Sequence, residues 1–261
     1  MTITLRTTTT VRASTTKRAP MDKMRKTALV AGVFYLITFI SIPTIALYRP
    51  VLNQRDWIIS SGGHTGVLVG GFLEVIVALA GIGTAVTLYP VVKRQNEGAA
   101  LGFVTARVLE AVMIFTGVVS LLSLVTLRQD LGGTAGANAA LVTTAASHVA
   151  IYNWTFLLSQ SLMPGINALL LGSLMYRSRL VPRIIPVMGL IGGPLLIIAV
   201  FATLFGQHSS LAGLALLPVI PVAAWEFSLG VWLAFKGFKP SPITAEMDAA
   251  STPPAYRDAA V

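Results

Sequence analysis

The sequence predicts an all-α polytopic membrane protein, with six transmembrane helices in one bundle. The chain of 261 residues is 54% hydrophobic and only 11% charged, with a mean hydropathy of +0.76. Soluble domains carry about 25% charged residues, so this chain is too apolar to cover a water-facing surface. Its apolar residues are also gathered in long stretches, separated by short polar or basic turns.

Each stretch is close to the roughly 20 residues that cross the hydrocarbon core as a helix. None shows the alternation of a membrane β-barrel strand, and an open strand would leave backbone groups unpaired in lipid. Helices are therefore predicted over residues 27–48, 65–92, 99–127, 149–176, 184–205 and 211–235. Prolines inside these stretches predict kinks, at Pro43, Pro164, Pro194, Pro218 and Pro221.

The predicted membrane domain covers residues 27–238 and lies between two tails. Residues 1–26 and 239–261 are expected to be disordered, because they hold too little apolar surface to fold. The outer loop at residues 128–148 is expected either to form a short interfacial helix in its second half or to extend the fourth span outward.

Lysine and arginine predict the orientation. Only Arg49, Arg55 and Arg128 fall on the outer side, and Arg107 lies within a span, whereas the other basic residues lie in the tails and inner turns. The positive-inside rule then places both termini in the cytoplasm. The basic residues that give the net charge of +9 lie in these turns and tails, beside the apolar spans. This placement predicts the lipid bilayer as the partner, and not nucleic acid.

Ionisable residues inside the spans are the main candidates for function. Glu74 lies in the second span, Glu226 in the sixth, and Glu110 in the third, one helical turn after Arg107. Such groups are costly at membrane depth and are functional candidates by default. Small residues on the same helix faces indicate that all three glutamates point into the bundle, near its midplane. Arg107 is shallower and is expected either to reach the inner headgroups or to pair with Glu110 or with Glu74.

The fourth span adds a polar row, because Asn153, Gln160 and Asn167 recur every seven residues and should share a face. One hypothesis is a ligand or proton site in a small proton-coupled transporter or ligand-binding membrane protein. The alternative is a structural or regulatory subunit in which these polar residues only clamp helices together. The candidate site comprises Glu74, Arg107, Glu110, Gln160, Asn167 and Glu226.

Other functional classes find little support. The chain has no cysteine, no Walker A loop, no dinucleotide fingerprint and no nucleophile elbow, so an enzyme is disfavoured and no cofactor is predicted. His64, His148 and His208 all map to the outer side. They are weak candidates for a metal site, because no close-spaced histidine motif supports one and outer-surface histidines are more often solvated.

Two further patterns concern the ends of the spans and the packing between helices. Tyr48, Trp57 and Trp154 lie near outer span ends and are typical of interfacial anchors. The Gly66-x-x-x-Gly70 and Gly189-x-x-x-Gly193 pairs predict close helix packing, either within the fold or between protomers, so a homo-oligomer stays open as an alternative.

Several stretches together resemble a bacterial multi-pass membrane family catalogued as a domain of unknown function, number four-three-eight-six. They include RKTALVAGVFYLITFIS, GGFLEVIVALAGIGTAVTLYPVVKRQNEG, NWTFLLSQSLMPGINALLLGSLMYRSRLVPRIIP and AAWEFSLGVWLAFKGF, and the resemblance covers about residues 25–238. It implies six helices in a bacterial inner membrane and brings no established activity. By resemblance, the family pattern uses Glu74, Arg107, Glu110, Trp154, Asn167, Arg177, Arg179, Pro182 and Glu226.

Overall fold

A computed structural model describes residues 22–132, 138–206 and 218–245. Every regular element in these ranges is helical, which confirms the all-α prediction. Most of the two predicted disordered tails lies outside the described residues, as does His208. In order, the elements are α1 (Lys23–Thr38), η1 (Phe39–Ser41), α2 (Thr44–Asn53), η2 (Trp57–Ile59), α3 (Thr65–Val92), α4 (Glu97–Leu131), α5 (Asn138–Leu157), η3 (Leu158–Leu162), α6 (Met163–Ser178), α7 (Ile184–Leu204) and α9 (Val219–Phe235).

Within the described ranges, five helical segments are long and apolar enough to cross a membrane. They are α1 with α2 (Lys23–Asn53), α3, α4, α5 with α6 (Asn138–Ser178) and α7. The sixth predicted span corresponds to α9, which is apolar but has only 17 residues. Its predicted beginning at residue 211 lies outside the described residues, which resume at Pro218.

Prolines explain where two of the elements begin. Pro43 separates α1 and η1 from α2 and forms the N-cap of α2, so the predicted break in the first span is confirmed. The predicted kinks at Pro218 and Pro221 stay predictions, because residues 211–217 of the predicted span lie outside the described residues. Pro218 is the N-cap of α9 and Pro221 lies in its first turn, where a proline removes no helical hydrogen bond because the first amides have no partner within the helix.

The fourth span begins earlier than predicted. α5 starts at Asn138 and continues through η3 into α6 without a break, so the second half of the outer loop extends the fourth span outward. α1 likewise starts at Lys23, four residues before the predicted limit of the first span.

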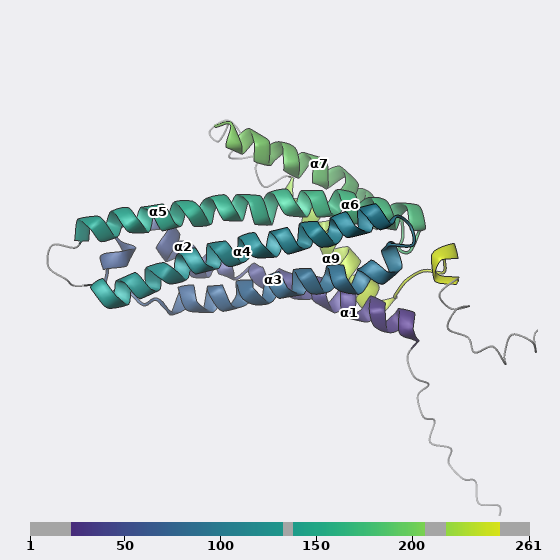
Figure 1. Cartoon of the computed structure of the whole chain (residues 1–261), viewed down its shortest axis with the longest axis horizontal. Coiled ribbons are helices and arrows are strands. Elements are labelled where there is room, and N and C mark those ends of the chain that lie inside the picture. Colours follow the sequence, from purple (N-terminus) through teal and green to yellow (C-terminus); the bar gives the residue numbers. More distant parts are fainter. Residues whose placement is uncertain (1–21, 133–137, 207–217, 246–261) are drawn as a thin grey trace, which may run out of the picture.

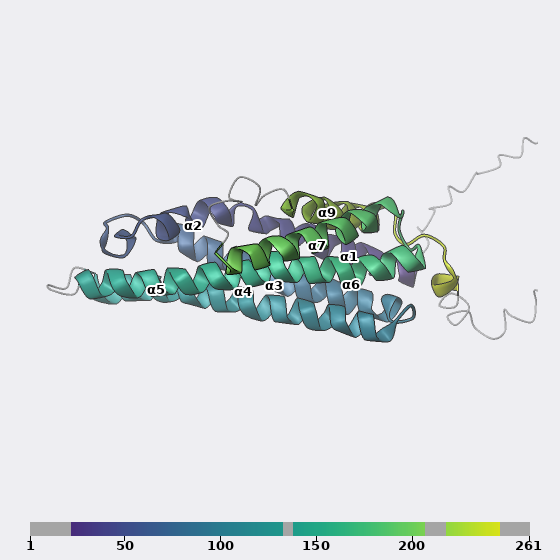
Figure 2. The same ribbon diagram turned by 90° about the horizontal axis from the view of Figure 1, so that it is seen from above.

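Helices of unequal length divide the molecule into two parts (Figures 1 and 2). α3, α4 and the α5–α6 rod run along most of its length, whereas α7 and α9 accompany them over only one half. The end shared by all these helices carries most of the described basic residues, including Lys93, Arg183 and Lys236, and we call it the basic end. The opposite end is the far end. α7 packs on α6 and α9, and α1 packs on α3 and α9.

The longest helices exceed the thickness of the hydrocarbon core. With 35 residues, α4 is roughly 52 Å long, whereas the hydrocarbon core is about 30 Å thick. Gly165 of α6 faces Gly193 of α7, so α7 ends about level with Trp154 of the rod. We call the region beyond this level the far lobe (residues 44–64, 120–132 and 138–150).

Glycines allow the closest helix contacts. A Cβ on Gly193 would lie 2.8 Å from the Gly165 carbonyl oxygen, and one on Gly189 would meet the Trp225 ring at 2.8 Å. Gly66 lies equally close to the Leu47 carbonyl oxygen, at 2.9 Å. Both predicted glycine pairs are therefore used within the fold, where α6, α7, α9 and α2 approach their neighbours.

The contact between α1 and α9 gives a test of this packing. We expect Gly32→Ala to destabilise the protein by about 1–3 kcal/mol, because overpacking forces backbones apart. The added Cβ would lie 2.7 Å from the Gly230 carbonyl oxygen. Thermal unfolding of the protein in detergent micelles measures the effect. Gly102→Ala is the matched control, since its Cβ would meet Leu170 at an ordinary 3.6 Å. Equal unfolding temperatures for the two variants would contradict the prediction.

Candidate functional site

Arg107 is the centre of a buried ion-pair cluster. It is 3% exposed, and its Nη1 donates to Glu110 Oε1 and Oε2 at 3.2 and 3.1 Å. Its Nη2 donates to Glu226 Oε1 at 2.6 Å. Arg107 and Glu110 are three residues apart on α4 and therefore share a face, whereas Glu226 comes from α9. One guanidinium thus joins two carboxyl groups from different helices.

Aromatic and amide side chains complete this cluster. Asn167 of α6 donates from Nδ2 to Glu110 Oε2 at 2.7 Å. The rings of Tyr35 and Phe103 lie 5.4 and 5.8 Å from the guanidinium, within the range of cation–π contacts. Arg107 Nε and Asn167 Oδ1 are buried and have no hydrogen-bond partner among the described residues. The cluster therefore retains unused donor and acceptor capacity.

A cavity of about 310 Å³ adjoins the cluster. Arg107, Glu110 and Glu226 line it, together with Gln160 and mainly apolar residues of η1, α7 and α9. Ile42 and Val219 also line the cavity and are 60% and 39% exposed, so it reaches the protein surface between η1 and the beginning of α9. Both carboxyl groups and the guanidinium are therefore accessible from a space large enough for a small molecule.

Glu74 belongs to a different group, and the expected alternative that it pairs with Arg107 is wrong. Its Oε1 accepts from Tyr152 Oη at 3.2 Å and from Gln160 Nε2 at 3.4 Å, and it forms no ion pair with any described residue. Gly81, seven residues nearer the basic end of α3, faces the Arg107 side chain. Glu74 therefore lies about 10 Å from that level, toward the far end.

Gln160 lies between the two groups because of a local change in helix geometry. It lies in η3, a π-helical turn that precedes Pro164. Pro164 has no N–H, so it cannot donate to the carbonyl of Gln160 four residues earlier, and the helix widens at this point. Gln160 contacts Glu74 and also lines the cavity beside Arg107.

The same π-helical turn corrects the predicted polar row on the fourth span. An extra residue per turn rotates the residues before η3 relative to those after it. Asn167 is buried and reaches Glu110, whereas Asn153 is exposed and lies beyond the cluster. The row therefore does not line a single face.

Tyrosines of the site were missed or misassigned by sequence reasoning. Tyr35 and Tyr152 were not singled out, and Tyr48 was expected at the membrane interface. Tyr48 is 1% exposed and packs edge to face on Tyr152, with ring centroids 5.4 Å apart. Trp57 is also buried rather than interfacial, at 3% exposed under the Arg128 guanidinium, whereas Trp154 is 51% exposed. A buried tyrosine hydroxyl inside an apolar span is a usable signal, because it needs a polar partner.

The histidines do not converge in the part of the chain that the structure describes. His64 Nε2 lies 3.1 Å from Gln129 Nε2, and His148 Nδ1 lies 3.1 Å from Ser120 Oγ. His208 lies outside the described residues. No group of three histidine, cysteine or acidic residues in the described ranges could hold a metal ion.

The apolar helices and their lengths define the chain as a multi-pass α-helical membrane protein. Its buried charges, paired across helices, are those of an integral bundle rather than of a surface-bound protein. The family comparison is specific: residues 30–237 match the model of a domain of unknown function, DUF4386, and the chain belongs to this family. No curated protein and no solved structure matches the chain.

Removing the arginine tests the ion-pair cluster. We expect Arg107→Gln to destabilise the protein by about 3–5 kcal/mol, because it leaves two buried carboxyl groups without their cation. Replacing Glu110 and Glu226 by Gln in the same chain should recover part of this loss, since no charge then lacks a partner. Thermal unfolding in micelles compares the three proteins. Arg49→Gln on the exposed surface of α2 is the control, and an unfolding temperature of Arg107→Gln equal to that of this control would refute the cluster's role.

Replacing Glu74 should change the stability less than removing Arg107 does. We expect Glu74→Gln to change stability by less than about 1 kcal/mol, because the Gln carbonyl oxygen can accept the same hydrogen bonds from the neutral Tyr152 and Gln160 side chains. The same unfolding measurement applies. A loss as large as that of Arg107→Gln would show that Glu74 depends on the cationic cluster after all.

Proposed function

We propose that this chain is a small six-span membrane protein that binds a proton or a small molecule at the Arg107, Glu110 and Glu226 cluster, as a proton-coupled transporter or a ligand-binding protein. The observation that supports it is the cavity: the paired charges line a space that reaches the surface instead of a closed interior. A cluster that served only to join helices would need no such space.

Charge balance favours a proton or a cationic group as the ligand. The cluster holds two carboxyl groups and one guanidinium. With both carboxyl groups ionised it carries an excess negative charge, which is costly in a low-dielectric interior. Uptake of a proton or of a cationic ligand removes this excess. We propose that the pair of Glu110 and Glu226 exchanges the proton, because both residues line the cavity and share the Arg107 guanidinium.

Glu74 supplies a second carboxyl group toward the far end. Gln160 contacts it and also lines the cavity, so it lies between the two groups. We propose that Glu74, Gln160 and the Arg107 cluster, with Asn167 holding Glu110, form one polar site along the bundle.

The proposed topology is six crossings of a bacterial plasma membrane with both termini in the cytoplasm. α1 begins and α9 ends at the basic end, as an even number of crossings requires. The concentration of Lys and Arg at this end favours the cytoplasmic side.

The alternative function is a structural or regulatory subunit. It is favoured by the contact of Arg107 Nη2 with Glu226, which joins α4 to α9 at 2.6 Å. In that case the ion pairs hold α9 in place, and the cavity is incidental.

Proton exchange distinguishes these functions. In proteoliposomes that contain a pH-sensitive dye, we expect the wild type to dissipate an imposed pH gradient faster than empty liposomes. Glu226→Gln should reduce the rate to that of empty liposomes, because an amide cannot exchange a proton. Glu110→Gln should reduce the rate as well, since Arg107 then neutralises the charge of the one remaining carboxylate and no excess negative charge favours proton uptake.

Infrared spectroscopy provides the second readout and the control. A change of pH should produce a carboxyl C=O band in the wild type that is absent in Glu226→Gln. Glu97→Gln, at the exposed beginning of α4, should match the wild type in both measurements. A wild type that shows neither flux nor a carboxyl band in the spans would favour the structural alternative.

A further inference from the structure

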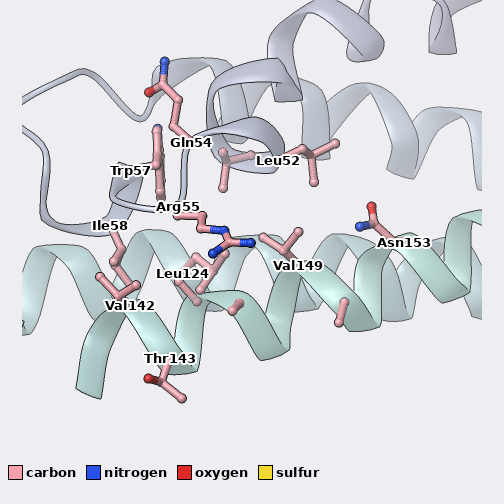
Figure 3. A pocket seen from close by; sticks show the side chains of 14 residues that line it. Leu52, Gln54, Arg55, Trp57, Ile58, Leu124, Val142, Thr143, Val149 and Asn153 are labelled. Atoms are coloured by element: carbon pink, nitrogen blue, oxygen red, sulfur yellow. The ribbon is translucent and has the colours of Figure 1, made fainter. Parts of the chain in front are cut away.

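The far lobe contains a groove larger than the cavity beside Arg107. Its volume is about 560 Å³, within the range of roughly 300–1,000 Å³ that holds drug-sized ligands. α2, the segment around η2, α4 and α5 form its walls (Figure 3). No residue of the Arg107 cluster lines it, so it is a separate site.

The inner wall of the groove is apolar. Leu52, Trp57, Ile58, Leu124, Val142 and Val149 line it, and most of them belong to or pack against one buried cluster that holds the far lobe together. Polar side chains are placed at its margin, where Gln54, Thr143 and Asn153 are exposed. A ligand with a large apolar part and a small polar part fits this distribution.

Among the described residues, Arg55 is the one charged residue that lines the groove. Figure 3 shows its guanidinium directed into the space between η2 and α5, close to Leu124 and Val149. It forms no ion pair with a described residue. Arg128 differs, because its guanidinium donates to the carbonyls of Ser60 and Gly62 and lies over the Trp57 ring at 4.5 Å. The Arg55 side chain therefore remains available for an anionic group.

The position of the groove relative to the bilayer suggests where its ligand comes from. Asn153 lies at its inner end, next to the exposed Trp154, about level with the end of α7. The groove thus begins at the membrane surface and extends away from it along α5. An amphiphile can leave the bilayer at this level and lay its chain on the apolar wall without crossing open water.

We propose that the far-lobe groove binds a single-chain amphiphile with an anionic head, such as a long-chain carboxylate. The aliphatic chain lies against Leu52, Leu124 and Val149, and the carboxylate accepts hydrogen bonds from the Arg55 guanidinium, a geometry that suits two parallel N–H···O bonds. This site does not depend on proton exchange at Arg107.

Equilibrium binding of radiolabelled dodecanoate to the full chain in lipid nanodiscs, with binding to empty nanodiscs subtracted, tests the proposal. We expect saturable binding of one dodecanoate per chain. Arg55→Gln should weaken it about tenfold, because a charge-assisted pair becomes a neutral hydrogen bond. Arg49→Gln, on α2 and outside the groove, is the matched control and should bind as the wild type does.

Two further arms test the chain-binding wall and the charge preference. Ala146→Trp places a large side chain in the groove from an exposed position on α5 and should abolish binding. Unlabelled dodecanoate should displace the label, whereas dodecyltrimethylammonium should not. No saturable binding by the wild type, unchanged binding by Arg55→Gln or Ala146→Trp, or equal displacement by the cationic amphiphile would each overturn the proposal.

Discussion

The burial of one guanidinium determines how the membrane-spanning part is built. A charge at that depth must be paired and hydrogen-bonded, because removing it from water without partners is prohibitive. Arg107 meets this requirement with Glu110 on its own helix and Glu226 on α9. The neighbouring helices leave room for it: Gly81 of α3 presents no side chain to Arg107, and Gly32 lets α1 approach α9 at backbone distance.

The pairing also links the two halves of the chain. Glu226 lies 119 residues from Arg107 in the sequence, and α9 reaches it only because it packs between α1 and α7. Asn167 adds α6 to the same cluster through Glu110. Four helices, α1, α4, α6 and α9, therefore meet around a single polar centre, with Tyr35 as the contribution of α1. The cavity lies where η1 follows the end of α1 and leaves the cluster uncovered on one side.

The cavity beside Arg107 and the far-lobe groove differ in character. Among the described residues that line them, the cavity has more carboxyl groups than cations, whereas the groove has a single arginine and no carboxyl group. The first suits a proton or a cationic group and the second suits an anion attached to an apolar chain. Tyr152 connects Glu74 to the groove, since it donates to Glu74 and belongs to the buried cluster under the groove. The length of α4 and α5 beyond α7 separates the two sites along the bundle (Figure 2).

The sequence by itself determined the helical class, the positions of the long apolar segments and the interior placement of Glu74, Glu110 and Asn167, because these depend on local hydrophobicity and on the helical repeat. Only the tertiary structure decided that Arg107 meets Glu226 and not Glu74, and that Tyr48 is buried under α3. These contacts depend on how far each helix is shifted along the bundle relative to its neighbours. Glycine contacts between residues far apart in the chain, together with the lengths of the helices, set this shift. The hydrophobic repeat within one helix does not specify it. Pro164 illustrates both contributions. The sequence shows that this residue has no N–H to donate to the helix. Only the folded rod shows that the resulting π-helical turn brings Gln160 to Glu74.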